Sequence, residues 1–199
     1  MNPIATYNRV YETTLDRLRP LDGVPPLLLR LILAPVMIQG GWVKATGFSA
    51  TVSWFGNTLG MPLPEVMAFL ATAAELGGGI MLLAGFATRL VAVPLMITML
   101  VAAFTVHWEN GWLVLSDASS WLANDRVMEA VARKAEIIAI LKEHGDYGWL
   151  TGRGRVTILN NGIEFAAMYF VMLLSLLFTG GGRYTSIDYW LARMTKGSA

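Results

Sequence analysis

Four long stretches of apolar residues divide the chain, at about 26–45, 64–86, 90–107 and 158–179. Each comes close to the roughly 20 residues that a helix needs to cross about 30 Å of hydrocarbon. A strand at that depth would leave backbone polar groups unpaired, so each stretch predicts a membrane-spanning helix. The pattern therefore predicts an all-α integral membrane protein, a four-helix bundle in which residues 1–199 form a single domain.

The first 25 residues have a different, amphipathic pattern. Tyr7, Tyr11, Leu15 and Leu18 fall three or four positions apart, with charged side chains between them. This spacing predicts a helix at the membrane surface over residues 1–25, with a helix that faces water as the alternative. The segment has no short apolar core before a small-residue cleavage site, so its pattern is not that of a signal peptide.

A second polar region separates the third and fourth apolar stretches, at residues 112–157. Within it, the spacing of apolar residues predicts a helix over residues 117–144, which Asp117 or Ser119 would cap and Gly145 would end. We expect this helix to lie on the membrane surface or over the mouth of the bundle.

The distribution of basic residues predicts the orientation in the membrane. Four spans place both termini on one side, and the basic residues divide almost evenly, with eight on that side and seven on the other. Basic residues in long loops count less, so we expect the termini in the cytoplasm and the chain in the cytoplasmic (inner) membrane. On the opposite side, turn signals in residues 46–63 predict an irregular loop.

Composition supports this class of protein and narrows its chemistry. Charged residues make up 15% of the 199 residues and the net charge is +1, whereas soluble domains carry about 25% charged residues. With no basic stripe, nucleic acid is not an expected partner. The chain contains no cysteine, so it can supply no disulfide, zinc-thiolate site, Fe–S ligand or thiol nucleophile. Its two histidines are far apart in the sequence, and no metal site is predicted.

Two ionisable residues lie well inside the predicted spans, where a charge at the centre costs roughly 2.5–3.5 kcal/mol. Glu75 falls near the middle of the second span, and Arg30 lies about one turn into the first. We expect these two side chains to pair, because pairing relieves the burial of both charges. Glu75 as a structural link between helices and Arg30 as a snorkelling side chain are the alternatives.

A second cluster is expected near the opposite ends of the spans. Lys44, His107 and Glu164 share that depth, with Asn161 close by. We expect them to meet at the mouth of the bundle, beneath the loops. Snorkelling of Lys44 and an interfacial position for His107 are the structural alternatives.

Four stretches of the sequence carry a family resemblance. They read LLLRLILAPVMIQGGWVKATGF, GMPLPEVMAFLATAAELGGGIMLLAGFATRL, AAFTVHWENGW and NNGIEFAAMYFVMLLSLLFTGGGRYTSIDYWL. Their order and the placement of their charges resemble the DoxX family of small four-helix bacterial and archaeal membrane proteins, over residues 26–111 and 158–191. The positions that the resemblance carries over are Arg30, Gly40, Lys44, Glu75, Gly85, Arg89, His107, Asn161, Glu164, Gly182, Ser186 and Asp188.

The resemblance implies a link to quinone chemistry, because the family takes its name from subunits of a membrane thiosulfate:quinone oxidoreductase. A quinone is then the implied cofactor, and other redox-complex subunits are implied partners beside the lipid bilayer. Glu75 and Arg30 would be the catalytic pair that handles charge or protons. The expected ligand-binding residues are Lys44, His107, Glu164, Asn161, Arg89 and Trp42. The insertion at residues 112–157 departs from the shortest family members.

Three hypotheses of different classes stay open from the sequence. The leading one is a redox-system subunit or accessory protein that binds a quinone or a similar lipid-soluble molecule in the bundle; with no cysteine in the chain, something bound to it must transfer the electrons. The second is a non-enzymatic protein that binds or transports a lipid or small solute. The third is an assembly subunit whose charges only hold helices together. Homo-oligomers are compatible with all three, and the sequence does not decide whether the chain is an enzyme.

Overall fold

The computed structural model of the chain describes residues 3–196 and confirms the all-α class. Within those residues no strand is present, and one isolated bridge joins Leu115 to Leu159. The chain divides into two compact units. Unit 1 comprises the residues up to Thr98 and those from Val171 onward, and unit 2 comprises Met99–Phe170.

The apolar stretches form helices. In the described part of the chain, three helical segments are long and apolar enough to cross a membrane: α2 (Val24–Thr46), α4 (Pro64–Ala84) and Thr88–Asn110. The third begins as α5 (Thr88–Ala102) and continues through a π turn, η3 (Ala103–His107), and a 3-10 turn, η4 (Trp108–Asn110). These segments confirm three of the four predicted spans as helices of membrane-crossing length.

The fourth apolar helix, α8 (Glu164–Thr179), is shorter than predicted. The prediction that it starts near residue 158 is wrong, because the residues before Glu164 are not helical. They hydrogen-bond to an extended segment instead: the backbone N–H groups of Asn160 and Asn161 donate to the carbonyl of Val114 at 2.8 and 2.9 Å. That pairing satisfies the backbone outside a helix.

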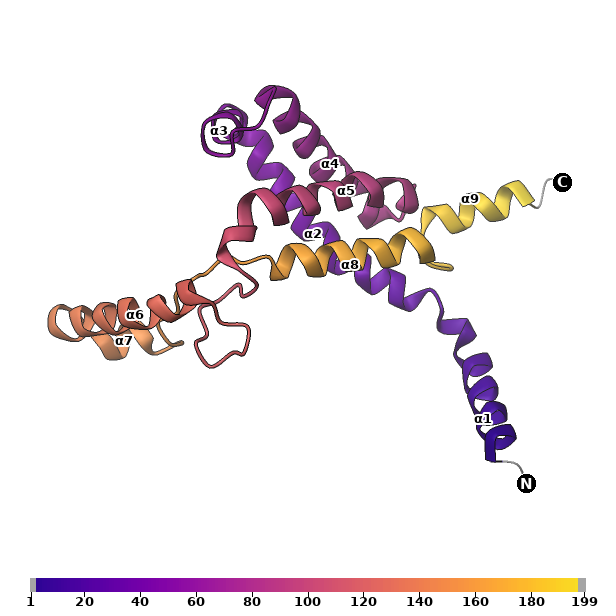
Figure 1. Ribbon diagram of the computed structural model, residues 1–199. Coiled ribbons are helices and arrows are strands. Elements are labelled where there is room, and N and C mark those ends of the chain that lie inside the picture. The colour runs from indigo at the N-terminus through magenta and orange to yellow at the C-terminus, as the bar shows by residue number, and fades with distance from the viewer. Residues whose placement is uncertain (1–2, 197–199) are drawn as a thin grey trace. The chain divides into compact units, whose positions relative to one another are not determined.

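Small residues bring α2 and α4 together in unit 1, where the two helices lie side by side (Figure 1). A Cβ atom on Gly79 would lie 2.9 Å from the backbone nitrogen of Ile38, and one on Gly41 would overlap the backbone of Leu76. Glycine therefore permits an approach that a side chain would block. Leucines from α2, α4, α5 and α8 fill the fully buried core of this unit: Leu33, Leu82, Leu95, Leu173 and Leu176.

The segment predicted as an irregular loop is mostly helical. It forms α3 (Phe48–Ser53) and a π turn, η2 (Trp54–Thr58), and residues Leu59–Leu63 after it are not helical. The prediction is wrong because a six-residue helix is too short to produce an apolar periodicity that stands out from the turn residues around it.

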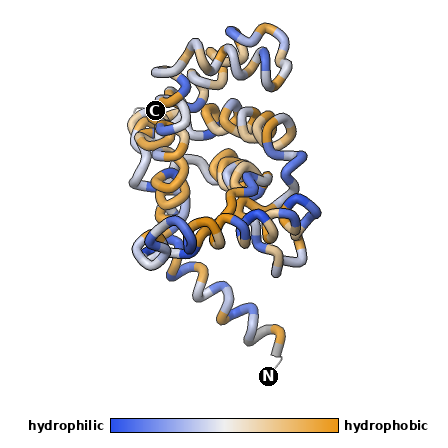
Figure 2. Tube along the Cα trace, turned by 90° about the vertical axis from the view of Figure 1, so that its left-hand side faces the viewer, coloured by the Kyte–Doolittle hydropathy of each residue, from blue (hydrophilic) through white to orange (hydrophobic). Residues whose placement is uncertain are grey.

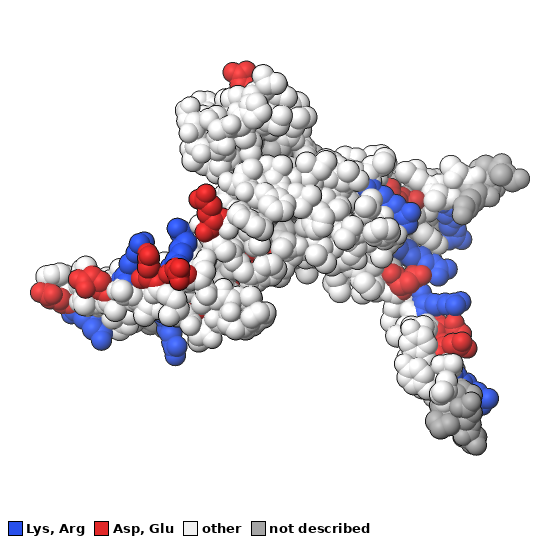
Figure 3. Space-filling view, viewed as in Figure 1, with Lys and Arg blue, Asp and Glu red and all other residues white. Residues whose placement is uncertain are grey.

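The two ends of unit 1 are amphipathic helices. The predicted N-terminal helix is confirmed as α1 (Pro3–Leu18), followed by a 3-10 turn, η1 (Arg19–Leu21), and Figure 2 shows hydrophilic and hydrophobic positions alternating along it. A further helix, α9 (Ile187–Lys196), follows the glycine-rich turn after α8. On the face that Figure 3 shows, charged side chains gather on α1, α9 and α6, whereas the surface over α5 and α8 carries almost none.

In unit 2 the predicted helix of the inserted segment exists but starts later. It is α6 (Asp125–His144), followed by α7 (Tyr147–Thr151). The cap is Asn124, whose side chain accepts a hydrogen bond from the N–H of Val127 at 3.0 Å. Asp117 instead accepts hydrogen bonds from the backbone and the hydroxyl of Ser119, which lower the pKa of Asp117. The predicted end at Gly145 is confirmed.

Candidate functional site

A buried ion pair links the two central helices of unit 1. The Nζ atom of Lys44, in the last turn of α2, lies 2.5 Å from Oε2 of Glu75, in the middle of α4. The Glu75 side chain is 10% exposed and that of Lys44 is 24% exposed. Gly40 makes room for the carboxylate, because a Cβ atom there would lie 2.9 Å from Glu75 Oε2. The carboxylate of Glu75 is therefore not an isolated charge between the helices.

The predicted pairing of Glu75 with Arg30 is wrong, and the helix register explains why. α2 and α4 run antiparallel, with Gly41 against Leu76, so Glu75 is level with the last turns of α2. Arg30 lies near the other end of α2, level with the last turn of α4. Seven residues separate Glu75 from Leu82 in the chain, or about 10 Å along a helix.

Arg30 is instead bonded to backbone oxygens. The residue is 2% exposed, and its guanidinium donates hydrogen bonds to four backbone carbonyls. Two of them, on Leu82 and Leu83 at 2.7 and 2.8 Å, belong to the end of α4, where carbonyls have no partner within the helix. The other two, on Gly181 and Thr185 at 2.5 and 3.2 Å, belong to the turn between α8 and α9.

Asp188 completes the same junction from the first turn of α9. Its two carboxylate oxygens accept hydrogen bonds from the backbone N–H groups of Ala87 and Thr88, at 2.7 and 2.9 Å. These are free donors at the start of α5, so the carboxylate caps that helix. Gly85 lies in the turn between α4 and α5, with a φ of 66°, and its carbonyl accepts a hydrogen bond from the Asp188 N–H. Arg30 and Asp188 therefore close two helix ends at a single turn.

Lys44 also forms part of the wall of a groove between α2 and α3, which we call the Lys44 groove. Its volume is about 500 Å³. The ammonium of Lys44 is its charged group, with the Glu75 carboxylate bonded to that ammonium. The sequence prediction missed Thr51 and Trp54, because both lie in the segment expected to be an irregular loop. The lining residues are Gln39, Gly40, Val43, Lys44, Gly47, Ala50, Thr51 and Trp54.

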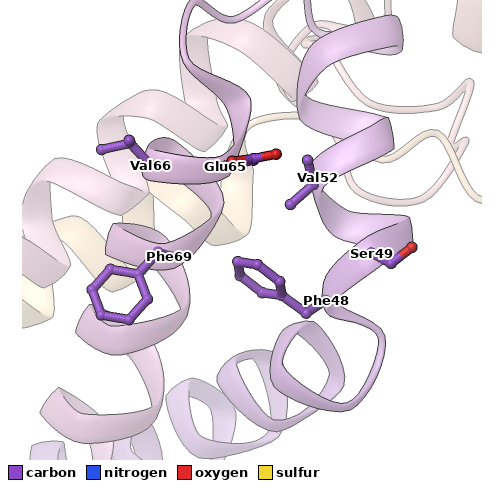
Figure 4. A pocket seen from close by; sticks show the side chains of 6 residues that line it. All are labelled: Phe48, Ser49, Val52, Glu65, Val66 and Phe69. Carbon is purple, nitrogen blue, oxygen red and sulfur yellow. The ribbon is translucent and has the colours of Figure 1, made fainter.

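The other face of α3 borders a second hollow, of about 510 Å³, against the start of α4. Figure 4 shows the rings of Phe48 and Phe69 and the side chain of Val66 around it, with Glu65 reaching toward Val52. Glu65 is exposed, and its carboxylate is the charged group of this wall. The two hollows thus differ in chemistry: the Lys44 groove presents a hydrogen-bond donor, and the second hollow presents an acceptor.

The predicted site residues of unit 2, His107, Asn161 and Glu164, take part in hydrogen bonds with the backbone of the same unit. The Nδ1 atom of His107 lies 2.8 Å from the backbone oxygen of Asn161, which also accepts a hydrogen bond from Asn110. Glu164 accepts one from the N–H of Val114 at 3.1 Å. These contacts tie the start of α8 to the chain that follows η4. The association of His107 and Glu164 with Lys44 stays a prediction.

Two further predicted residues lie at the surface of unit 1. Trp42 is 60% exposed and is absent from the wall of the Lys44 groove. Arg89, at the start of α5, is also exposed and donates a hydrogen bond to the carbonyl of Phe178 at 3.0 Å. Neither lies at the ion pair.

Apolar helices of spanning length, together with charges buried between them, define an α-helical membrane protein. A model of the DoxX family matches residues 26–108, which include the ion pair and both hollows. The chain belongs to the DoxX family. No solved structure matches it.

Three curated proteins are similar to this chain. "Putative oxidoreductase CatD" of Bacillus subtilis (strain 168) is 38% identical over 80 residues, which are 40% of this chain and 58% of CatD. "Inner membrane protein YqjF" of Escherichia coli (strain K12) is 32% identical over 90 residues, 45% of this chain and 67% of YqjF. "Inner membrane protein YphA" of the same organism is 32% identical over 92 residues, 46% of this chain and 64% of YphA. The similarity to CatD thus spans less than two thirds of that protein.

Proposed function

We propose that this chain is a membrane subunit or accessory protein of a quinone-linked redox system, and that it binds a quinone or a similar lipid-soluble ring in the Lys44 groove. The observation that carries the proposal is the Lys44–Glu75 ion pair in the wall of that groove. The name of CatD, which includes an oxidoreductase assignment, supports the redox class.

The residues present fit such a ligand. A quinone offers two carbonyl oxygens, which accept hydrogen bonds, on a flat apolar ring. The ammonium of Lys44 has three N–H donors, of which the hydrogen bond to Glu75 uses one. Val43, Ala50 and the indole of Trp54 supply the apolar wall. A site of this kind, mostly apolar with a few placed polar groups, is typical of small-ligand binding.

The two charged residues have different roles in this proposal. Lys44 is the binding residue, because it lines the groove and donates to the ligand oxygen. Glu75 is a positioning residue, because it holds the ammonium at the wall and balances its charge. A bound quinone would supply the redox chemistry, as an acceptor of two electrons and two protons. The electrons would come from a donor outside the chain, since the chain has no cysteine with which to hold a metal–sulfur centre.

The proposed place of action is the cytoplasmic membrane, with the termini on the cytoplasmic side. YqjF and YphA are named as inner membrane proteins, and the shorter segments on the side of the termini carry the basic residues that count most for orientation. The chain lacks cysteine, so a single cysteine placed at Thr195 provides a label without background. We expect a membrane-impermeant thiol reagent to label T195C in inverted vesicles and not in intact cells; the reverse result contradicts the orientation.

A titration tests the binding proposal. The full chain in nanodiscs is titrated with a short-chain quinone, and affinity is read from quenching of tryptophan fluorescence. We expect Lys44→Met to weaken binding about ten-fold or more, the loss of a hydrogen bond to a charged group. Glu75→Gln should weaken it less, because the ammonium is present but less well held.

Glu65→Gln is the matched control, since it neutralises a carboxylate of the same helix in the other hollow. It should leave quinone affinity unchanged. If Lys44→Met binds as tightly as the unaltered chain, the proposed site is wrong. Solute flux through proteoliposomes that disappears in Glu75→Gln, without quinone binding, would favour the transport hypothesis instead.

A further inference from the structure

We propose that a second site in unit 1, at the turn between α8 and α9, binds the phosphate of an anionic phospholipid headgroup. The site is a hollow of about 460 Å³, which we call the Arg89 hollow. Its wall includes Arg89 from the start of α5, the turn Gly180–Gly182, Arg183, and Asp188 and Tyr189 from α9. It is distinct from the Lys44 groove and shares no lining residue with it.

The charge of this hollow favours an anion. Arg89 and Arg183 both line it and are exposed, so each guanidinium can reach a ligand. Arg89 uses one N–H group on the carbonyl of Phe178, and a guanidinium has five. Asp188 is the acidic residue of the wall, but both its oxygens already accept backbone hydrogen bonds from the start of α5. Two arginines against one carboxylate leave the wall with a net positive charge, and the arginines keep unused donors.

Contacts on Arg183 hold its side chain beside the hollow. The guanidinium lies 4.9 Å from the centre of the Tyr184 ring and 3.6 Å from Asp22, which lies between η1 and α2. A hydrogen bond with Tyr189 is the main cause that raises the pKa of Arg183. Neighbours that orient an arginine reduce the side-chain entropy that binding must remove.

The glycine turn lets Arg89 pack closely against the backbone. Gly180 and Gly182 have φ values of 76° and 97°, which side chains rarely adopt. Arg89 lies directly over Gly180: a Cβ atom on that glycine would be 3.3 Å from Nε of Arg89. Arginine forks suit a phosphate, because the phosphate oxygens can accept several hydrogen bonds at once.

The surroundings identify the source of the phosphate as lipid. The hollow lies just past the end of α8 and before the start of α5, where apolar helices give way to polar turns. Tyr184, Tyr189 and Trp190 pack edge to face beside it, with ring centres 5.0 and 5.4 Å apart. Aromatic residues of this kind are enriched at the membrane–water boundary, and basic hollows at that depth bind anionic lipid headgroups.

The test is native mass spectrometry of the full chain, which counts bound phosphatidylglycerol against phosphatidylcholine at equal concentration. We expect the unaltered chain to prefer phosphatidylglycerol. Arg89→Gln should lower that preference about five-fold and R89Q/R183Q further, because each basic residue contributes separately to binding an anionic lipid. Arg89→Lys, which keeps the charge without the fork, should retain more of the preference than Arg89→Gln.

Arg193→Gln is the matched control, because Arg193 is an exposed arginine of α9 outside the wall of the hollow. It should change the preference little. If Arg193→Gln lowers the preference as much as Arg89→Gln, general surface charge binds the lipid and the proposed site is wrong. If millimolar inorganic phosphate abolishes the preference for phosphatidylglycerol, the site binds free phosphate and the lipid assignment is wrong.

Discussion

Unit 1 buries two cations, Arg30 and Lys44, in the same helix and satisfies them in opposite ways. Arg30 is closed off: it is 2% exposed and donates to four backbone carbonyls. Lys44 is partly open: it pairs with Glu75 and faces a groove. A saturated charge holds helix ends together, whereas a charge with spare donors can bind a ligand. Charge at membrane depth therefore does not by itself identify a functional residue; its unused hydrogen-bonding capacity does.

The largest expected effect comes from removing Arg30. Arg30→Met removes the donor to the carbonyls of Leu83 and Gly181, and leaves the carbonyl of Leu82 with its hydrogen bond from the Gly85 N–H alone. Several unsatisfied buried groups should together cost about 3–5 kcal/mol of unfolding free energy. Thermal unfolding of the detergent-solubilised chain should show a Tm about 10 °C lower. Arg19→Met, a change of an exposed arginine, is the control. If Arg30→Met and Arg19→Met have the same Tm, Arg30 does not stabilise the junction.

The next largest effect is expected at Gly85, which packs against Arg30 in the same junction. Gly85→Ala places a Cβ atom 2.7 Å from Cζ of Arg30 and 2.6 Å from Cβ of Ser186, at a φ of 66°. We expect a loss of about 2–3 kcal/mol from strain and displacement of the guanidinium. Gly77→Ala is the matched control, because nothing lies within 4 Å of its Cβ position; it should be neutral or slightly stabilising. Equal Tm values for the two variants would contradict the close packing at Gly85.

A double-mutant cycle measures the coupling free energy between Lys44 and Glu75. Lys44→Met or Glu75→Gln alone leaves a partly buried charge without its partner and should cost about 1–3 kcal/mol. The double variant K44M/E75Q should lose less than the sum, with a coupling of at least about 1 kcal/mol. Chemical unfolding of all four proteins under the same conditions gives the coupling. Strictly additive losses would mean that the ion pair contributes nothing.

The smallest expected effect is at the cap of α5. Asp188→Ala removes the acceptor of two N–H groups, at Ala87 and Thr88. Loss of an N-terminal cap costs about 1 kcal/mol, so the Tm should fall by about 2–4 °C. Asp22→Ala, on an exposed carboxylate paired with Arg183 at 3.6 Å, should change the Tm less. A larger fall in Asp22→Ala would reverse the assignment of the cap.

Sequence reasoning predicted what depends on local composition. Apolar length alone located three spanning helices, and amphipathic spacing located α1. It failed where distant backbone competes for the same residues: residues 158–163 belong to the last predicted span, but they pair with the segment around Val114. It also placed the cap of α6 at Asp117 or Ser119, although a similar side chain, Asn124, is the cap used.

The candidate site shows the same limit more sharply. Glu75 and Lys44 both stood out in the sequence as charges at membrane depth, but their partnership depends on the register between α2 and α4. That register follows from glycine contacts such as Gly41 against Leu76, which no local pattern reveals. The groove depends on α3, which is too short to predict, so Thr51 and Trp54 could not be assigned to it in advance.

The most direct test of the proposed site maps where a quinone lies. The full chain in nanodiscs is irradiated with a photoreactive quinone, digested, and its labelled residues are identified by mass spectrometry, with excess unreactive quinone as competitor. We predict competed labelling on α2, at Val43 and its neighbours, which Lys44→Met abolishes. Competed labelling at Val66 and Phe69 of α4, unchanged in Lys44→Met, would place the ligand in the other hollow and contradict the account.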